Sequence, residues 1–234
     1  MHAAAQKFAA RWQKFQNTKA YDLAAIVPLI VWYGSSALQQ LPDLIRKFAN
    51  ASALNIDVNF IVSVLAEVGS FIFVIMILIF LVLRSPVRAR AKGLAPSIVA
   101  TLGAFFAVTV VWLPRVELGF AMSMVSLMLI LTGIVFSTYT MLFLGRSFSI
   151  MPQARELVIS GPYALVRHPL YLGEGLAIIG TMLQFISPLA LVIVGLQCAF
   201  QVQRMKNEEA VLMSQYPEYR DYMARTARVI PGVY

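Results

Sequence analysis

The chain has 234 residues, of which 59% are hydrophobic and only 13% are charged, yet its formal net charge is +8. An ordinary soluble domain is about half apolar and about a quarter charged, so this composition excludes most soluble classes. One cysteine excludes an internal disulfide scaffold, and the basic residues punctuate long apolar runs instead of covering a polar nucleic-acid-binding face. The composition therefore predicts an integral membrane protein.

The first 20 residues are basic and carry a helical repeat of aromatic side chains. Phe8, Trp12 and Phe15 recur at helical spacing, and lysines and an arginine occupy the opposite face. Such a pattern is typical of an amphipathic helix that lies in the membrane interface. We therefore expect residues 1–20 to form an interfacial helix on the inner membrane surface.

Five apolar runs follow, at residues 21–41, 58–83, 98–113, 119–144 and 171–203. A bilayer core of about 30 Å requires about 20 apolar residues in a helix. The last run is too long for one span and holds Ser187 and Pro188 near its middle. Proline removes a backbone donor and disfavours helix just before it, so this run is interpreted as two helices in a tight hairpin. The prediction is an all-α, polytopic fold with six transmembrane segments.

The lysines and arginines test this topology. Sixteen of the 19 fall in alternate segments between the apolar runs, and three fall in the others. The positive-inside rule places the rich segments, and both termini, in the cytoplasm. The expected organisation is one membrane domain over residues 1–234, with four spans at 21–144. Residues 145–234 would then hold a cytoplasmic loop, the hairpin and a cytoplasmic tail.

Two cytoplasmic segments, residues 157–175 and 204–222, are richer in polar and turn-forming residues than topology requires. The predicted hairpin joins them, so the residues before its first helix lie near those after its second helix. The side chains expected to meet at this surface are Arg167, His168, Tyr171, Arg204, Glu208 and Glu209.

The order of residues in these segments carries a family resemblance. The first motif reads Gly161-Pro162-Tyr163, then Arg167-His168-Pro169, then Tyr171 and Gly173. The second reads Arg204, Glu208-Glu209 and Leu212, followed by Tyr219, Tyr222 and Pro231. This arrangement resembles the integral membrane methyltransferases that include isoprenylcysteine carboxyl methyltransferases and phospholipid methyltransferases. The resemblance covers residues 145–231.

The resemblance implies S-adenosylmethionine as methyl donor, bound at the cytoplasmic side, and a lipophilic acceptor that enters from the bilayer. A guanidinium fork matches the donor's carboxylate, and glutamates and aromatic rings suit its hydroxyls, amino group and adenine. The cofactor-binding residues it indicates are Gly161, Pro162, Tyr163, Arg167, His168, Tyr171, Gly173, Gly175, Glu208 and Glu209. The catalytic residues it indicates are Arg204, Glu208 and His168.

The methyl acceptor stays open between a carboxylate, an amine and a thiol. A carboxylate needs no general base, whereas an amine or a thiol must lose a proton, which His168 or a glutamate can accept. The resemblance adds one departure: eukaryotic isoprenylcysteine enzymes commonly have a histidine where Glu156 stands here. That departure weighs against a prenylcysteine acceptor.

Other readings of the sequence compete with a methyltransferase. Glu67 lies inside an apolar run, where a carboxylate is costly and marks either a functional group or a partner on a neighbouring helix. A small transporter with Glu67 on its pathway, or a non-catalytic membrane scaffold, are the alternatives. Glu174 adjoins the first motif and either lines the site or faces away from it. Two histidines and one cysteine lead us to expect no metal site.

Overall fold

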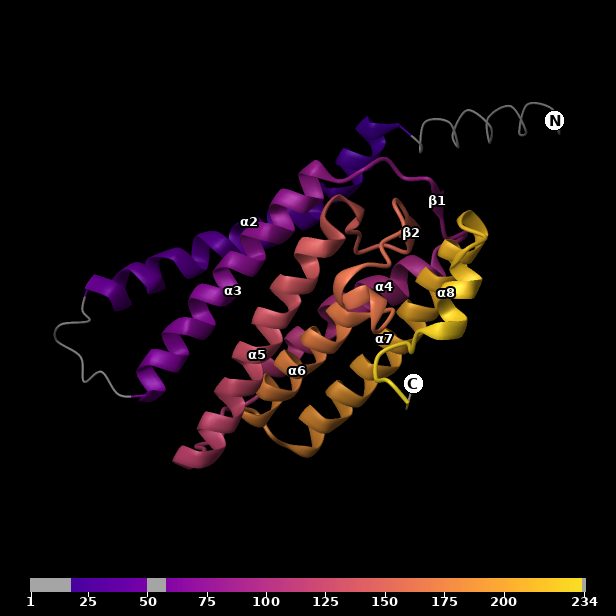
Figure 1. Ribbon diagram of the computed structural model, residues 1–234. Helices are drawn as coiled ribbons and strands as arrows, with labels where there is room; N and C mark the ends of the chain where they lie inside the picture. The colour runs from indigo at the N-terminus through magenta and orange to yellow at the C-terminus, as the bar shows by residue number, and fades with distance from the viewer. Residues whose placement is uncertain (1–17, 50–57, 233–234) are drawn as a thin grey trace.

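The computed structural model describes residues 18–49 and 58–232, and its long helices lie roughly side by side (Figure 1). The predicted interfacial helix at residues 1–20 falls almost wholly outside the described residues. The helices are α2 (Lys19–Ala49), α3 (Val58–Leu83), α4 (Ala95–Phe105), α5 (Phe120–Leu144), α6 (Pro169–Leu183), α7 (Pro188–Gln215) and α8 (Tyr219–Arg225). The all-α fold expected from the apolar runs is confirmed.

Short elements connect these helices. The described part of the chain contains the 3-10 helices η2 (Phe106–Trp112), η3 (Gly145–Ser147) and η4 (Gly161–Ala164). The strands β1 (Ala89–Arg90) and β2 (Gln153–Ala154) pair antiparallel, with Ala89 opposite Ala154. This pairing fixes the loop after α5 against the loop after α3.

Within residues 18–49 and 58–232, five helical segments are long and apolar enough to cross a bilayer: Tyr21–Ala49, Phe60–Leu83, Ala95–Trp112, Phe120–Ser147 and Pro188–Gln215. The apolar helix α6 has 15 residues. At 1.5 Å per residue it is about 22 Å long, shorter than the bilayer core of about 30 Å. Six crossings, and the cytoplasmic placement of both termini, therefore stay predictions.

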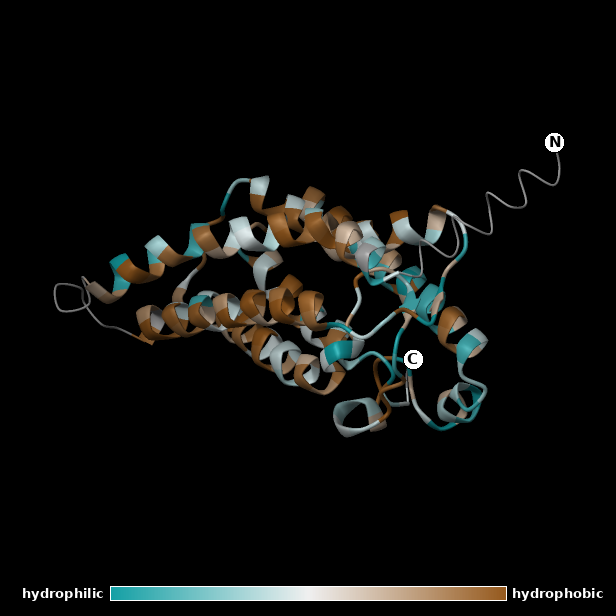
Figure 2. Cartoon of the chain, turned by 90° about the horizontal axis from the view of Figure 1, so that it is seen from above, coloured by the Kyte–Doolittle hydropathy of each residue, from teal (hydrophilic) through white to brown (hydrophobic). Residues whose placement is uncertain are grey.

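The long helices carry apolar side chains on their outer faces as well as between helices. Leu38 and Val31 on α2, for example, are 73% and 64% exposed. Apolar surface of this extent is rare on soluble monomers, whereas lipid tails solvate it well. Figure 2 shows hydrophobic residues along the helices, with hydrophilic residues gathered toward the end that holds the C-terminus. These features are those of an integral membrane protein.

The predicted break in the last apolar run is confirmed. Helix α6 ends at Leu183, and α7 begins at Pro188, where the missing N–H of a first-turn proline costs nothing. The hydroxyl of Ser187 accepts a hydrogen bond from the amide of Ala190 at 3.1 Å and caps α7. Helix α7 continues to Gln215, twelve residues beyond the expected end, so Arg204 and Glu208 stand on one continuous helix.

The carboxylate of Glu67 has a partner on the neighbouring helix. Lys47, in the last turn of α2, donates a hydrogen bond to it, and the Glu67 side chain is 41% exposed. Glu67 lines neither of the two cavities described below. The ion pair between α2 and α3 therefore explains why a carboxylate lies on this apolar helix, without a role for Glu67 in a transport pathway.

Helices α5 and α6 approach each other through small residues. A Cβ added to Gly173 would lie 2.4 Å from the Ser137 hydroxyl, and one added to Gly133 would lie 2.6 Å from the Gly173 carbonyl oxygen. The hydroxyl of Ser126 donates to the Gly180 carbonyl at 2.8 Å across the same contact. Close backbone approach between small residues is the usual way in which membrane helices associate.

Substitution of Gly173 by alanine is expected to destabilise the protein by about 1–3 kcal/mol, because the methyl group overpacks this contact. The matched control is Gly175→Ala, since nothing lies within 4 Å of a Cβ at that position. Thermal unfolding in detergent measures both variants. Equal melting temperatures for the two variants would contradict this account of the α5–α6 contact.

Candidate active site

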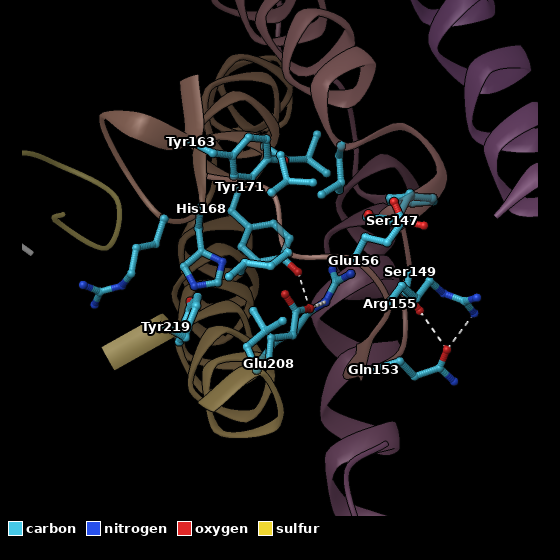
Figure 3. Close-up of a pocket in the computed structure, with 18 of the residues that line it drawn as sticks. Ser147, Ser149, Gln153, Arg155, Glu156, Tyr163, His168, Tyr171, Glu208 and Tyr219 are labelled. Carbon is cyan, nitrogen blue, oxygen red and sulfur yellow. Dashed lines mark hydrogen bonds and ion pairs between the residues drawn. The ribbon is translucent and has the colours of Figure 1, made fainter. Parts of the chain in front are cut away.

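A polar cavity opens at the end of the helices where the loop after α5, η4, the start of α6, α7 and α8 converge (Figure 3). It encloses about 780 Å³ of space that no atom fills, part of it open to solvent. Tyr163, His168 and Tyr171 line one side, and Glu208 on α7 faces Tyr171. The other side is formed by the loop after α5, with Ser147, Ser149, Gln153, Arg155 and Glu156.

The first motif is folded by a turn at its glycine and by pairing with the tail. Gly161 has a φ of +59°, and a Cβ there would lie 2.3 Å from the Phe143 ring, so this position needs glycine on both counts. The amides of Arg167 and His168 donate to the carbonyls of Ala227 and Arg228, each at 2.9 Å. The motif is therefore held between α5 and the residues that follow α8.

Glu209 joins three basic side chains. Its carboxylate accepts from Arg167 Nε at 2.8 Å and from Arg228 Nη2 at 2.8 Å, and it lies 3.1 Å from His168 Nε2. Glu209 is only 2% exposed. Arg167 also donates to the carbonyls of Met223, at 3.0 Å, and of Thr226. Because the Glu209 carboxylate is already surrounded by these donors, it ties the first motif, α7 and the tail together.

A second cluster forms around Arg204. Its Nε donates to Glu208 Oε1 at 3.2 Å, its Nη2 donates to the Ile150 carbonyl at 3.1 Å, and its guanidinium lies 4.7 Å from the Tyr171 ring centroid. The Tyr171 hydroxyl donates to Glu208, and the His168 ring stacks on Tyr171 with centroids 5.4 Å apart. The structure thus brings together all six side chains that the hairpin argument expected to meet.

Three buried tyrosines also line the cavity: Tyr163, Tyr219 and Tyr222. Tyr163 is 6% exposed, and its hydroxyl is buried without a hydrogen-bond partner among the described residues. Burial raises the pKa of Tyr163 and of Tyr219, and it raises the pKa of Tyr222 to about 12. These hydroxyls therefore stay protonated near neutral pH, and that of Tyr222 donates to the Tyr163 carbonyl. A buried hydroxyl without a partner is costly, and that of Tyr163 keeps its proton available for a hydrogen bond.

Sequence reasoning did not single out the residues of the loop after α5 that line this cavity. Arg155 is 1% exposed and donates from Nη2 to both oxygens of Asp22 at 3.0 Å, and Arg84 Nε lies 2.8 Å from the same carboxylate. Desolvation lowers the pKa of Arg155, and the Asp22 carboxylate opposes that shift. Glu156 accepts from the Ser85 hydroxyl at 2.6 Å. The sequence did contain one signal for this contact. Asp22 lies at the start of the first span, and a buried carboxylate there needs a basic partner such as Arg155.

Five of the predicted cofactor-binding residues lie outside the lining of this cavity: Gly161, Pro162, Gly173, Gly175 and Glu209. Gly161 makes the turn beside Phe143, and Gly173 lies in the contact between α5 and α6, which accounts for both glycines without a cofactor. Helix packing is thus a sufficient reason for Gly173, and its cofactor-binding role stays a prediction. Glu209 acts on the cavity through Arg167 and His168, which do line it.

A second, larger and mostly apolar cavity lies between the long helices. It encloses about 1300 Å³ of space that no atom fills, part of it open to the surroundings. Its walls come from α2 to α7 and η2, with Trp32, Phe105 and Ile178 among its apolar side chains. Phe148 and Arg204 line both cavities, so the two spaces are neighbours separated by these side chains.

A comparison with known protein families matches the part of the chain that holds most of this site. The family model described as phospholipid methyltransferase matches residues 114–219, which include both motifs, the hairpin and α7. The matched segment is similar to the phospholipid methyltransferase family. The expected resemblance is thereby confirmed over these residues.

Two curated relatives share part of the sequence. Nickel-cobalt-cadmium resistance protein NccN of Alcaligenes xylosoxydans xylosoxydans is 31% identical over 81 residues, which are 34% of this chain and 38% of the relative. Cobalt-zinc-cadmium resistance protein CzcN of Cupriavidus metallidurans is 36% identical over 76 residues, which are 32% of this chain and 35% of the relative. The matched segment therefore covers less than two fifths of either relative.

Proposed function

We propose that this protein is an integral membrane methyltransferase that uses S-adenosylmethionine and methylates a lipophilic acceptor. The observation that carries the proposal is the polar cavity formed by both family motifs, with a buried tyrosine hydroxyl left unpartnered among the described residues. An apolar cavity adjoins it across Arg204. A water-soluble donor in the first cavity and a lipophilic acceptor in the second fit the chemistry of the two linings.

The residues of the first cavity match the groups of the proposed cofactor. Arg204 uses two of its five N–H donors in the bonds given above, so others remain for a carboxylate. Glu208 and Glu156 offer carboxylate oxygens to ribose hydroxyls and an ammonium group. Tyr163 offers a hydroxyl, and the stacked pair of His168 and Tyr171 offers aromatic surface for an adenine. These are the residues that would hold the cofactor.

S-adenosylmethionine supplies, when bound, a methyl group activated by a sulfonium. Methyl transfer is a direct displacement, so the main task of the chain is to hold donor and acceptor in line, which can contribute about 7–11 kcal/mol. Glu208 is fixed by Arg204 and by Tyr171, and it can stabilise positive charge. Glu209 holds His168 and Arg167 in place. Phe148 and Arg204 at the boundary separate the polar space from the apolar one.

Binding of S-adenosylhomocysteine, measured by calorimetry in detergent, tests the assignment. We expect binding to the wild-type chain and a loss of about two- to tenfold in affinity for Tyr163→Phe, because one neutral hydrogen bond contributes about 0.5–1.5 kcal/mol. Tyr139→Phe is the matched control, since Tyr139 is 49% exposed on α5 and lines no part of the polar cavity. Absence of binding at millimolar ligand would overturn the proposal.

A further inference from the structure

The loop after α5 forms one side of the polar cavity but contains little regular structure of its own. Residues 145–158 include only the short elements η3 and β2. The side chains of Ser149, Gln153 and Arg155 in this loop line the cavity. A segment with so little regular structure keeps its place through contacts with other parts of the chain. These contacts therefore decide whether the cavity keeps its shape.

Arg155 connects the lining of the cavity to distant parts of the chain. Its Nη2 donates to both carboxylate oxygens of Asp22 at 3.0 Å and to Gln153 Oε1 at 2.9 Å. The same Gln153 oxygen accepts from the Ser149 hydroxyl at 3.2 Å (Figure 3). The Nη1 of Arg155 donates to the Ser85 carbonyl. One guanidinium thus fixes three lining side chains relative to α2 and to the segment after α3.

Asp22 is the carboxylate that balances this part of the protein. It is 6% exposed and lies in the first turn of α2, where the helix dipole favours a negative charge. Besides Arg155, it pairs with Arg84 Nε at 2.8 Å and with Arg90 Nη2 at 3.4 Å. Desolvation, and then repulsion from Arg155, already lower the pKa of Arg84 to about 10. Without the Asp22 charge, three guanidinium groups would repel one another in a space with little water.

The backbone contacts of the loop depend on the same carboxylate. The amides of Arg88 and Ala91 donate to the carbonyls of Ala154 and Pro152, at 2.8 Å and 3.0 Å. These bonds attach the loop to residues 84–91, and that segment carries two of the arginines that pair with Asp22. Asp22 therefore holds the loop directly and also holds the segment to which the loop is paired.

We propose that Asp22 is a positioning residue of the methyl-donor site, which through Arg155 holds the loop after α5 as one side of the polar cavity. This inference rests on the proposed function, because it places the donor in that cavity. Asp22 does not line the cavity and lies outside the matched residues 114–219, so α2 becomes part of the donor-binding unit. The Tyr216 hydroxyl also donates to the Arg155 carbonyl. Loss of Asp22 should therefore weaken donor binding without abolishing it.

Calorimetric titration of the full chain in detergent with S-adenosylhomocysteine tests the proposal, at a temperature at which every variant is folded. The variant is Asp22→Asn, which keeps the size of the side chain and loses its charge. We expect its dissociation constant to rise by about tenfold, because apparent affinity falls with the fraction of molecules whose binding site is formed.

Two controls separate this effect from loss of charge and from loss of stability. Asp43→Asn removes the same charge from the same helix, where Asp43 forms an exposed pair with Arg46. Gly180→Ala overpacks the α5–α6 contact outside both cavities, because a Cβ there would lie 2.7 Å from the Ser126 carbonyl oxygen. Both controls are expected to bind S-adenosylhomocysteine like the wild type.

A double variant tests the route through Arg155. In an Arg155→Gln background, Asp22→Asn is expected to weaken binding by less than about twofold, because the connection to the cavity is already broken. Hydrogen exchange gives a second readout. In Asp22→Asn the amides of Arg88 and Ala91 should exchange faster, and saturating S-adenosylhomocysteine should slow them again, since ligand and Asp22 stabilise the same loop arrangement. A general loss of stability would instead speed exchange in α5, α6 and α7 as well.

Wild-type affinity in Asp22→Asn, an equal loss of affinity in Gly180→Ala, or an undiminished effect of Asp22→Asn in the Arg155→Gln background would overturn the inference. Failure of S-adenosylhomocysteine to bind the wild-type chain would instead overturn the proposed function itself. Exchange at Arg88 and Ala91 would in that case still report whether Asp22 holds the loop.

Discussion

Replacement of Glu209 by alanine is expected to lower the free energy of unfolding by about 3–5 kcal/mol, the usual cost of removing one member of a buried ion cluster. The reason is the surroundings of this carboxylate, which is only 2% exposed and bonded to Arg167 and Arg228. Without it, two guanidinium groups and His168 lose their shared partner. The first motif and the tail should then separate from α7, and cofactor affinity should fall with them.

Thermal and denaturant-induced unfolding in detergent measure this effect. Glu218→Ala is the matched control, because Glu218 is an exposed glutamate just before α8 and should change stability by less than about 0.5 kcal/mol. Glu209→Gln should fall between the two, since it keeps an acceptor oxygen but loses the charge. A fall of less than about 1 kcal/mol in the free energy of unfolding of Glu209→Ala would show that this carboxylate does not hold the first motif and the tail against α7.

Arg204→Ala is expected to reduce methyl transfer by about 10²–10³-fold, comparable to the loss of one preorganised donor from other active sites. Arg204 is 3% exposed, orients Glu208 and lines both cavities. Arg204→Lys should recover little activity, because an ammonium cannot reproduce the planar fork that contacts Glu208, Ile150 and the Tyr171 ring.

The readout is the transfer of labelled methyl groups to lipid-soluble product, together with the melting temperature of each variant. Lys206→Ala, an exposed position two residues away on α7, controls for loss of basic charge at this surface. Near-wild-type transfer in a folded Arg204→Lys variant would mean that the position needs only a positive charge, as topology alone would explain.

The sequence predicted the features that depend on local signals. Ser187 and Pro188 placed the hairpin break because a capping hydroxyl followed by proline both ends one helix and starts the next. A tight hairpin brings the residues before its first helix close to those after its second helix, so it also predicts that His168 lies near Glu209. The two motifs therefore predict one face of the cavity from the sequence alone.

The other face depended on contacts that leave little trace in the sequence. The loop after α5 is held by Asp22, more than 130 residues away, through Arg155. No spacing rule connects residues so far apart. Arg228 looked like one more basic residue of a cytoplasmic tail, and only its position 2.8 Å from Glu209 distinguishes it.

The glycines of the first motif show a different difficulty. Gly173 is needed for the close approach of α5, which no single-helix pattern reveals, whereas Gly175 has open space around it. Glu174, between them, faces a cavity whose other walls come from helices far away in the chain. A carboxylate next to a known motif is visible in the sequence, but its task depends on which cavity it lines.

Photo-crosslinking of methyl-tritiated S-adenosylmethionine to the full chain in detergent determines whether the polar cavity binds the methyl donor. We expect label on peptides from residues 145–171 and 204–222, which line the polar cavity, and we expect excess S-adenosylhomocysteine to abolish it. The α2–α3 pair should stay unlabelled. Label confined to that pair, or label that S-adenosylhomocysteine does not displace, would contradict the assignment of this cavity to the methyl donor.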